Sequence, residues 1–235
     1  MEFEQAQEVF LRGDLARAQN QAEVGWRYYS VRDPLWAWNF RVLDSRVLTW
    51  RGMYGDVFPV VSADFPTSLK NSDLDFQRRA QIAFAYIGMH RLAEAEALLG
   101  ELEQNCLASG SDVISQVFIA LGMFQVERGE YNRAQLQFEK SLQLARQRKN
   151  RFTEAVALLK LSNTALLQEH FDEAIEWSKA AHEAAETIGA KLIMEGASGN
   201  RGWAYYKTGD SERALDLFVE ANLTAEELGD LFDEV

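Results

Sequence analysis

The chain has 235 residues, of which 47% are hydrophobic and 26% are charged, as in an ordinary soluble folded protein. Its single cysteine, Cys106, excludes a disulfide framework and a cysteine metal cluster. No stretch is long and apolar enough to span a membrane, and residues 1–12 lack the basic start and apolar centre of a signal peptide. A cytoplasmic protein is therefore expected.

The net charge of −12 is unevenly distributed. Residues 169–235 hold 5 basic and 16 acidic residues, whereas residues 1–168 hold 19 and 20. Such an acidic segment disfavours nucleic acid and anionic membranes as partners, and it is also typical of a solvated helix surface. The basic run 146–151 ends a predicted helix, where cations complement the helix dipole. We therefore predict no nucleic-acid partner and no membrane partner.

The first predicted element is a helix pair in residues 2–31 that turns at Gly13. The second pair, residues 33–71, opens at Asp33-Pro34, because aspartate caps a helix and proline fits its first turn. Pro59 and Pro66 flank its second helix. This helix is predicted to be short and to lead into a loop, since proline interrupts helical hydrogen bonding.

Four further pairs are predicted at residues 72–109, 111–149, 151–189 and 190–228. Phe152, Leu192 and Phe232 are spaced 40 residues apart, and the first two begin the last two pairs. Residues 230–235 are therefore predicted to begin a truncated seventh pair. The chain is expected to be a fragment of a longer protein whose effector domain follows residue 235.

The six predicted pairs align in columns. The turns recur every 38 to 40 residues, at Gly13, Gly52, His90, Gly129, Glu169 and Gly209. Seven residues before each turn stands a small residue, namely Ala6, Ser45, Ala83, Gly122, Ser162 and Gly202. Five residues after each turn stand Ala18, Val57, Ala95, Ala134, Ala174 and Ala214. Small residues let two antiparallel helices cross closely, and a left-handed residue ends the first helix. Since no pair can bury its apolar face alone, the pairs must stack.

These columns resemble the tetratricopeptide repeat (TPR), and the resemblance covers essentially the whole chain. The closest matches are Gly122, Tyr131, Ala134 and Phe138 in the fourth pair and Gly202, Tyr205, Ala214, Phe218 and Ala221 in the sixth. The period is longer than the family's usual unit of about 34 residues. The resemblance implies an all-α fold, a right-handed α-solenoid of about six repeats forming a single domain over residues 1–235. Such long-period arrays are similar to those of bacterial multidomain signalling proteins, for example arrays that precede caspase-like CHAT peptidase domains.

The sequence shows no constellation of catalytic residues. It contains neither a glycine-rich phosphate loop nor a Gly-x-Ser-x-Gly elbow. His90, His170 and His182 are far apart, so neither a metal nor a cofactor is expected. Cys106 falls in a predicted helix, where a packed thiol is more common than a nucleophile. We therefore expect a binding protein rather than an enzyme.

In the TPR family, the first helix of each pair lines the concave surface. Positions ten, six and three before each turn give an inward stripe, which reads Phe3-Gln7-Phe10, Val42-Arg46-Thr49, Ala80-Phe84-Ile87, Ile119-Met123-Val126, Leu159-Asn163-Leu166 and Gly199-Trp203-Tyr206. The stripe is mostly apolar, so either it is a binding surface, to which Phe84 and Met123 would contribute, or neighbouring repeats bury it.

Two asparagines indicate a peptide site. Peptide-binding members of the family often place one asparagine six residues before a turn and another nine residues before the next turn, and Asn163 and Asn200 match these positions. An amide side chain donates and accepts, so it can pair with an extended peptide backbone. The resemblance implies a peptide site made of Asn163, Asn200, Trp203, Tyr206, Lys160 and Lys207. The alternative is that both asparagines only bridge helices.

The sequence thus predicts a non-catalytic module that binds a protein or peptide and regulates an attached effector domain. Two alternatives stay open. The concave face could serve a small-molecule sensor, as in the TPR-like array of the maltose-responsive transcription activator. The aromatic segment 26–54 could instead support self-association, although core packing explains its aromatic residues equally well.

Overall fold

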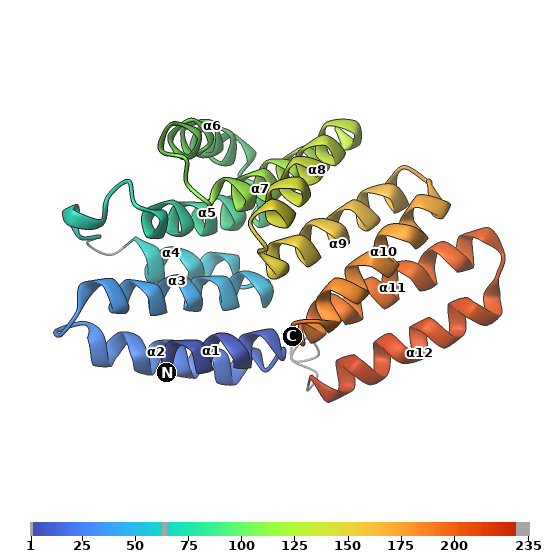
Figure 1. Ribbon diagram of the computed structural model, residues 1–235, viewed down its shortest axis with the longest axis horizontal. Coiled ribbons are helices and arrows are strands. Elements are labelled where there is room, and N and C mark those ends of the chain that lie inside the picture. The colour runs from blue at the N-terminus through green and yellow to red at the C-terminus, as the bar shows by residue number, and fades with distance from the viewer. Residues whose placement is uncertain (1, 63–64, 229–235) are drawn as a thin grey trace. The chain divides into compact units, whose positions relative to one another are not determined.

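The computed structural model describes residues 2–62 and 65–228, and within these ranges the chain is all-helical (Figure 1). The elements are α1 (Glu2–Leu11), α2 (Leu15–Tyr29), α3 (Pro34–Trp50), α4 (Tyr54–Val61), the short 3₁₀ helix η1 (Thr67–Leu69), α5 (Asp73–Gly88), α6 (Leu92–Ser109), α7 (Ile114–Glu127), α8 (Tyr131–Gln147), α9 (Arg151–Leu167), α10 (Phe171–Glu186), α11 (Lys191–Thr208) and α12 (Ser211–Glu227). As predicted, consecutive helices form the helix-turn-helix repeats of an α-solenoid. The predicted start of a seventh repeat at residues 230–235 lies outside the described ranges.

The turns inside the pairs adopt the left-handed conformation. All six residues of the predicted turn column have positive φ, with values from 55° to 89°: Gly13, Gly52, His90, Gly129, Glu169 and Gly209. Glycine reaches this region without strain, whereas a residue with a Cβ atom does so at some cost in free energy. The turn column is therefore confirmed, including the two positions that hold histidine and glutamate.

A second set of left-handed residues follows the second helices of several pairs. It consists of Asn71, Gly110, Lys149 and Gly189, with φ between 56° and 69°. These positions recur with nearly the same period as the turn column, so they mark the passage from one pair to the next. This column was not predicted from the sequence, because only two of its four residues are glycine.

The small residues of the repeat are buried where the helices cross. Ala6, Ser45, Ala83 and Ser162 have no exposed surface, and Gly122 and Gly202 are buried too. A Cβ atom placed on Gly122 would lie 2.4 Å from the ring of Phe138, which is itself 1% exposed. The ring of Phe138 in α8 therefore lies directly on the backbone of α7, an approach that only glycine permits.

The helices divide into two compact units. Unit 1 consists of Met1–Phe10 and Asp14–Ala120, and unit 2 of Leu11–Gly13 and Leu121–Val235. The largest fully buried side chains of unit 1 include Phe40, Leu43, Phe76 and Leu99, and those of unit 2 include Phe138, Leu158, Leu161 and Ile193. Each unit thus has an apolar core of its own. The single solenoid over residues 1–235 and its repeat boundaries remain a prediction.

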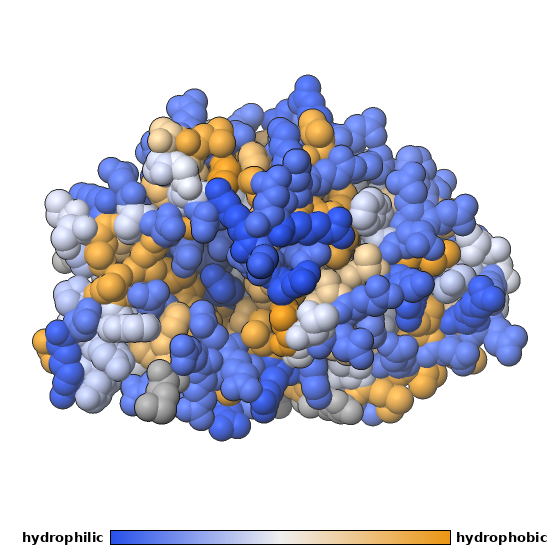
Figure 2. Space-filling view, in the orientation of Figure 1, coloured by the Kyte–Doolittle hydropathy of each residue, from blue (hydrophilic) through white to orange (hydrophobic). Residues whose placement is uncertain are grey.

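The surface combines charged residues with scattered apolar ones. On the face drawn in Figure 2, hydrophilic side chains predominate and hydrophobic residues form separate patches. None of the described helices is long and apolar enough to cross a lipid bilayer.

Unit 1 contains a buried carboxyl group. Asp44 of α3 is 4% exposed, and its Oδ1 has no hydrogen-bond partner among the described residues. Burial, with the negative charge of Glu23, raises the pKa of Asp44 to about 7 against the opposing effect of Arg41. The guanidinium of Arg41 donates instead to the carbonyl oxygen of Val60, at 2.9 Å.

Asp44 should make the stability of the protein depend on pH. Its pKa in the folded state lies above that in the unfolded chain. Between about pH 4 and pH 7, the folded state therefore retains a proton that the unfolded state has lost. The free energy of unfolding should therefore fall as pH rises through this window. We expect Asp44→Asn to raise the free energy of unfolding at pH 8 by about 2–3 kcal/mol more than it does at pH 5, where only part of this window has been crossed.

Urea denaturation at the two pH values measures this difference. Asp216→Asn is the control, because Asp216 is exposed on α12 and its substitution should change stability by less than about 0.5 kcal/mol. Equal effects of Asp44→Asn at both pH values would contradict the assignment.

Candidate peptide-binding site

The candidate site lies on α9 and α11, the first helices of two consecutive pairs in unit 2. The two helices are joined directly, because Asn200 Nδ2 donates a hydrogen bond to Ser162 Oγ at 2.8 Å. They also approach closely, since a Cβ atom on Gly196 would lie 3.5 Å from the Leu159 side chain. Asn200 therefore bridges two helices, which is the role that the alternative interpretation gave to both asparagines.

The side chains that surround this bridge are exposed. Asn163 follows Ser162 on α9 and has no hydrogen-bond partner among the described residues. On α11, Gly199, Trp203 and Tyr206 share one face of the helix at spacings of four and three residues. A Cβ atom on Gly199 would meet nothing within 4 Å, so the backbone of α11 is open there.

The two aromatic residues form a small shelf. Trp203 is 46% and Tyr206 is 55% exposed, and their ring centroids are 5.5 Å apart at an interplanar angle of 31°. Lys207 Nζ lies 5.5 Å from the centroid of the Trp203 ring, within the range of a cation–π contact. The shelf therefore combines exposed aromatic surface with a positive charge over the Trp203 ring.

The other predicted site residues are placed differently. Lys160 of α9 is half-buried, and burial lowers the pKa of its ammonium group. Met123 of α7 is half-buried in unit 2. Phe84 of α5 is also half-buried, but it belongs to unit 1, whereas α9 and α11 belong to unit 2.

Much of the apolar inward stripe is packed rather than exposed. Phe10, Val42, Ala80, Ile87 and Ile119 are all buried. The exposed part of the stripe is concentrated at Asn163, Trp203 and Tyr206, so the asparagine and aromatic positions are the accessible ones.

A polar cluster in unit 2 was not foreseen from the sequence. His182 Nδ1 lies 3.2 Å from Ser198 Oγ, and Ser198 Oγ donates to Glu220 Oε1 at 2.8 Å. In a catalytic triad the histidine stands between serine and acid, whereas here the serine stands between histidine and acid. Ser198 is also 1% exposed. The cluster therefore joins α10, α11 and α12, and the buried serine hydroxyl donates to the glutamate rather than to the histidine.

Cys106 is buried, whereas the two remaining histidines are exposed. Cys106 of α6 is buried, and burial raises the pKa of its thiol to about 11, which disfavours the reactive thiolate. His90 and His170 lie exposed at turns. Among the described residues, no group of three or more His, Cys, Asp or Glu side chains is arranged to hold a metal ion.

Comparison with solved structures reveals several chains with similar backbones. The Rap protein in complex with Competence and Sporulation Factor superimposes with a TM-score of 0.69 at 11% identity, covering 98% of this chain and 75% of Rap. BtubC (BKLC) from P. vanneervenii gives 0.65 at 15% identity, covering 91% and 92%. The nearly identical TPR-like repeats of a kinesin light chain candidate from Podosopora anserina give 0.55 at 14% identity, covering 80% and 94%.

The chain has the fold of TPR-like repeat proteins. No family model matches the sequence, and a search of curated proteins found no match. The TPR-like fold confirms the resemblance seen in the repeat columns, although the sequence identities are too low to carry a function across.

The two asparagines should differ in their effect on stability. Asn200→Ala removes the hydrogen bond to Ser162 and should lower the free energy of unfolding by about 1 kcal/mol. Asn163→Ala removes an exposed side chain without a partner in the described residues, so its effect should stay within about 0.5 kcal/mol. Chemical denaturation of both variants tests this, and equal stability of the two would contradict a bridging role for Asn200.

Proposed function

We propose that this TPR-like chain is a non-catalytic module that binds an extended peptide segment of a partner protein across α9 and α11. The observation that carries the proposal is the exposed strip of Asn163, Trp203 and Tyr206 beside the open backbone of Gly199. Each part of the strip matches one requirement of an extended ligand.

The amide groups suit the main chain of a peptide. The Asn163 side chain can both donate to a peptide carbonyl and accept from a peptide N–H. Asn200 uses one N–H for Ser162, which leaves its second N–H and its carbonyl oxygen for a ligand and holds the amide in a fixed orientation. The missing side chain at Gly199 leaves room for the ligand backbone between the two helices.

The neighbouring residues suit peptide side chains. Trp203 and Tyr206 offer exposed aromatic faces, which supply large contact areas at low cost in side-chain entropy. Lys207 and Lys160 would attract a carboxylate of the ligand. The charge of Lys207 is notable because residues 169–235 carry 16 acidic against 5 basic residues. The fold itself is compatible with ligand binding, since the similar Rap protein was crystallised in complex with Competence and Sporulation Factor.

Self-association is the second candidate function, and one feature of unit 1 favours it. Within the aromatic segment 26–54, Trp38 and Phe40 are buried, whereas Tyr28 and Trp36 are roughly half exposed. Val31 and Leu35, which lie near these residues in the sequence, are exposed as well. Core packing therefore accounts for only part of this segment.

Filling the space at Gly199 should separate binding from stability. We expect Gly199→Leu to raise the free energy of unfolding by about 0.8 kcal/mol, because leucine favours the helix and the Cβ position is open. The same substitution should weaken peptide binding at least about tenfold, because the leucine side chain occupies the place of the ligand backbone. The probe is a displayed library of random dodecapeptides selected on the unmodified protein, with affinities measured by fluorescence anisotropy.

Gly100→Leu is the matched control. Gly100 also lies in a helix with nothing near its Cβ position, but it is on α6 in unit 1. This variant should gain similar stability and bind the selected peptides unchanged. The proposal fails if no peptide is enriched, or if enriched peptides bind Gly199→Leu as tightly as the unmodified protein.

A further inference from the structure

The exposed face of α12 carries an apolar stripe. Leu215, Val219 and Leu223, here called the α12 stripe, recur every four residues and therefore form one ridge along the helix. They are 64%, 50% and 55% exposed. Since Ala214 and Leu217 of the same helix are buried, α12 is apolar on two faces. A contiguous apolar patch that stays exposed is typical of an interaction site.

The corresponding positions of other second helices are polar. Val219 and Leu223 stand ten and fourteen residues after the turn at Gly209. At these two positions α2, α6, α8 and α10 hold, in chain order, Glu23 and Arg27, Gly100 and Gln104, Glu139 and Gln143, and Lys179 and Glu183. Seven of these eight residues are polar and the other is glycine. α12 therefore departs from the repeat at both positions.

The stacking of repeats does not account for these two apolar residues. α11 packs against α10, and yet Lys179 and Glu183 of α10 are exposed. A following pair thus leaves these positions of a second helix open to solvent. Only the position of Leu215 is partly covered in this way, since its counterpart Ile175 is half-buried. The apolar residues at the other two positions need a different explanation.

Acidic side chains flank the α12 stripe. Glu212, Asp216 and Glu226 each stand three residues from one member of the stripe, so they are its neighbours on the helix surface. All three are exposed. α12 holds five acidic residues and one basic residue, Arg213. Because Arg213 Nε lies 3.4 Å from Asp210 Oδ2, its positive charge is already paired at the start of the helix.

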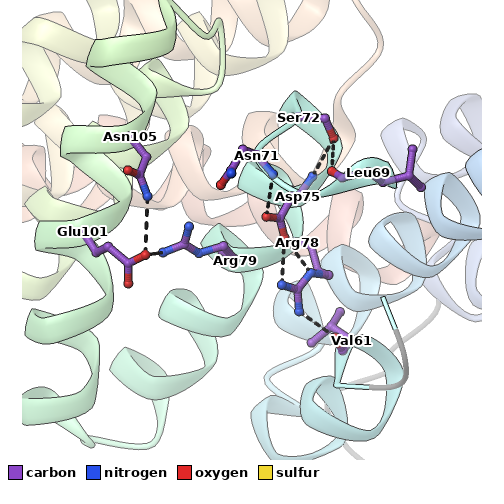
Figure 3. Close-up of polar contacts among 9 residues, drawn as sticks. All are labelled: Val61, Leu69, Asn71, Ser72, Asp75, Arg78, Arg79, Glu101 and Asn105. Atoms are coloured by element: carbon purple, nitrogen blue, oxygen red, sulfur yellow. Dashed lines mark hydrogen bonds and ion pairs between the residues drawn. The ribbon is translucent and has the colours of Figure 1, made fainter. Parts of the chain in front are cut away.

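The carboxylates of Glu212 and Asp216 have no basic partner among the described residues. Unit 1 offers a contrast, because a carboxylate of α5 is fully paired there (Figure 3). Arg78 Nη2 donates to Asp75 Oδ1 at 2.8 Å, and Arg78 Nη1 donates to the carbonyl oxygen of Val61 at 3.0 Å. An unpaired carboxylate adds net attraction for a cation of a ligand, whereas a paired one must first give up its partner.

We propose that the α12 stripe binds an amphipathic helix of a partner protein, one that carries lysine or arginine beside its apolar face. The apolar face packs on the stripe, and the cations pair with Glu212 and Asp216. A helix fits because residues four apart form a ridge that packs into the groove of a second helix. Addition of an extended strand is excluded, since it requires the edge of a sheet.

The charge around the stripe favours a basic helix over another α12. A second α12 would bring five acidic residues of its own against the stripe, and like charges repel. The stripe is also separate from the peptide site proposed at Asn163, Trp203 and Tyr206, because those residues lie on α9 and α11. The inference therefore adds a second interaction surface to the proposed function.

The test uses a displayed library of alanine-based helices of four turns in which one face is randomised. Selection on the full chain should enrich helices that carry apolar residues flanked by lysine or arginine. Val219→Lys places a cation in the middle of the stripe and should weaken the enriched helices at least about tenfold. The melting temperature should be retained, because Val219 is half exposed and lysine favours a helix more than valine does.

Gln143→Lys is the matched control for this variant. It adds the same charge at an exposed position of α8 and should leave helix binding unchanged.

A pair of charge variants checks the electrostatic part. Glu212→Gln with Asp216→Asn should weaken binding of the enriched helices. Asp172→Asn with Glu176→Gln removes the same charge from the corresponding exposed positions of α10 and should leave binding unchanged.

The inference is overturned if no helix is enriched, if the enriched helices lack basic residues, or if they bind Val219→Lys with unchanged affinity. Sedimentation velocity separates a second copy from a partner protein. An increase of mass with concentration that Val219→Lys abolishes would show that the stripe binds another copy, and would overturn the inference too. Gly199→Leu should leave helix binding unchanged, so failure of this site can be distinguished from failure of the peptide site.

Discussion

The close crossing of the two helices in each pair is the contact on which the rest of the structure depends. The sizes of the two residues that meet at this crossing vary together, so that a larger residue on one helix faces a smaller one on the other. Where phenylalanine stands nine residues after the turn, at Phe138 and Phe218, the small column holds glycine, at Gly122 and Gly202. Where that residue is smaller, alanine or serine suffices, as in Ala83 with Leu99. The two columns together therefore keep the volume at the crossing within the limits of close packing.

This contact also sets the rotation of each first helix and hence what it exposes. Ser162 shows the link directly, because it is the small residue of its pair, has no exposed surface, and accepts the hydrogen bond of Asn200. The residue that lets α9 approach α10 thus also ties α9 to α11. With Ser162 buried, Asn163 is turned outward, and the face of α11 that carries Trp203 is exposed beside it.

The short helix α4 modifies the same arrangement in unit 1. A second helix normally covers the first helix of the next pair, and α4 stops about two turns early by comparison with α2. Because Arg41 and Arg78 satisfy its last carbonyl groups, the shortened helix needs no further turns to complete its hydrogen bonding.

The repeat could be predicted from the sequence because its turn and crossing positions are restricted to few residue types. The left-handed turns at His90 and Glu169 were found through their spacing, although neither residue is glycine. Asn71 and Lys149 adopt the same conformation at the ends of second helices, and no residue preference marked them. Pro59 and Pro66 indicated a short helix, but the arginines of two other helices that bind its last carbonyl groups could not be predicted. Likewise, the spacing of Asn163 and Asn200 predicted the candidate site. The hydrogen bond from Asn200 to Ser162 could not be predicted, because it depends on how α9 and α11 lie side by side.

The coupling between Gly122 and Phe138 tests the account most directly. Gly122→Ala alone should lower the free energy of unfolding by about 1–2 kcal/mol, because overpacking against the Phe138 ring outweighs the better helix propensity of alanine. In a Phe138→Leu background, which reproduces the natural combination of Ala83 and Leu99, the same substitution should cost at least about 1 kcal/mol less. Denaturant unfolding of the two single variants and the double variant gives this coupling energy. Additive effects, within about 0.5 kcal/mol, would contradict the claim that compensated close packing determines how the helices pair.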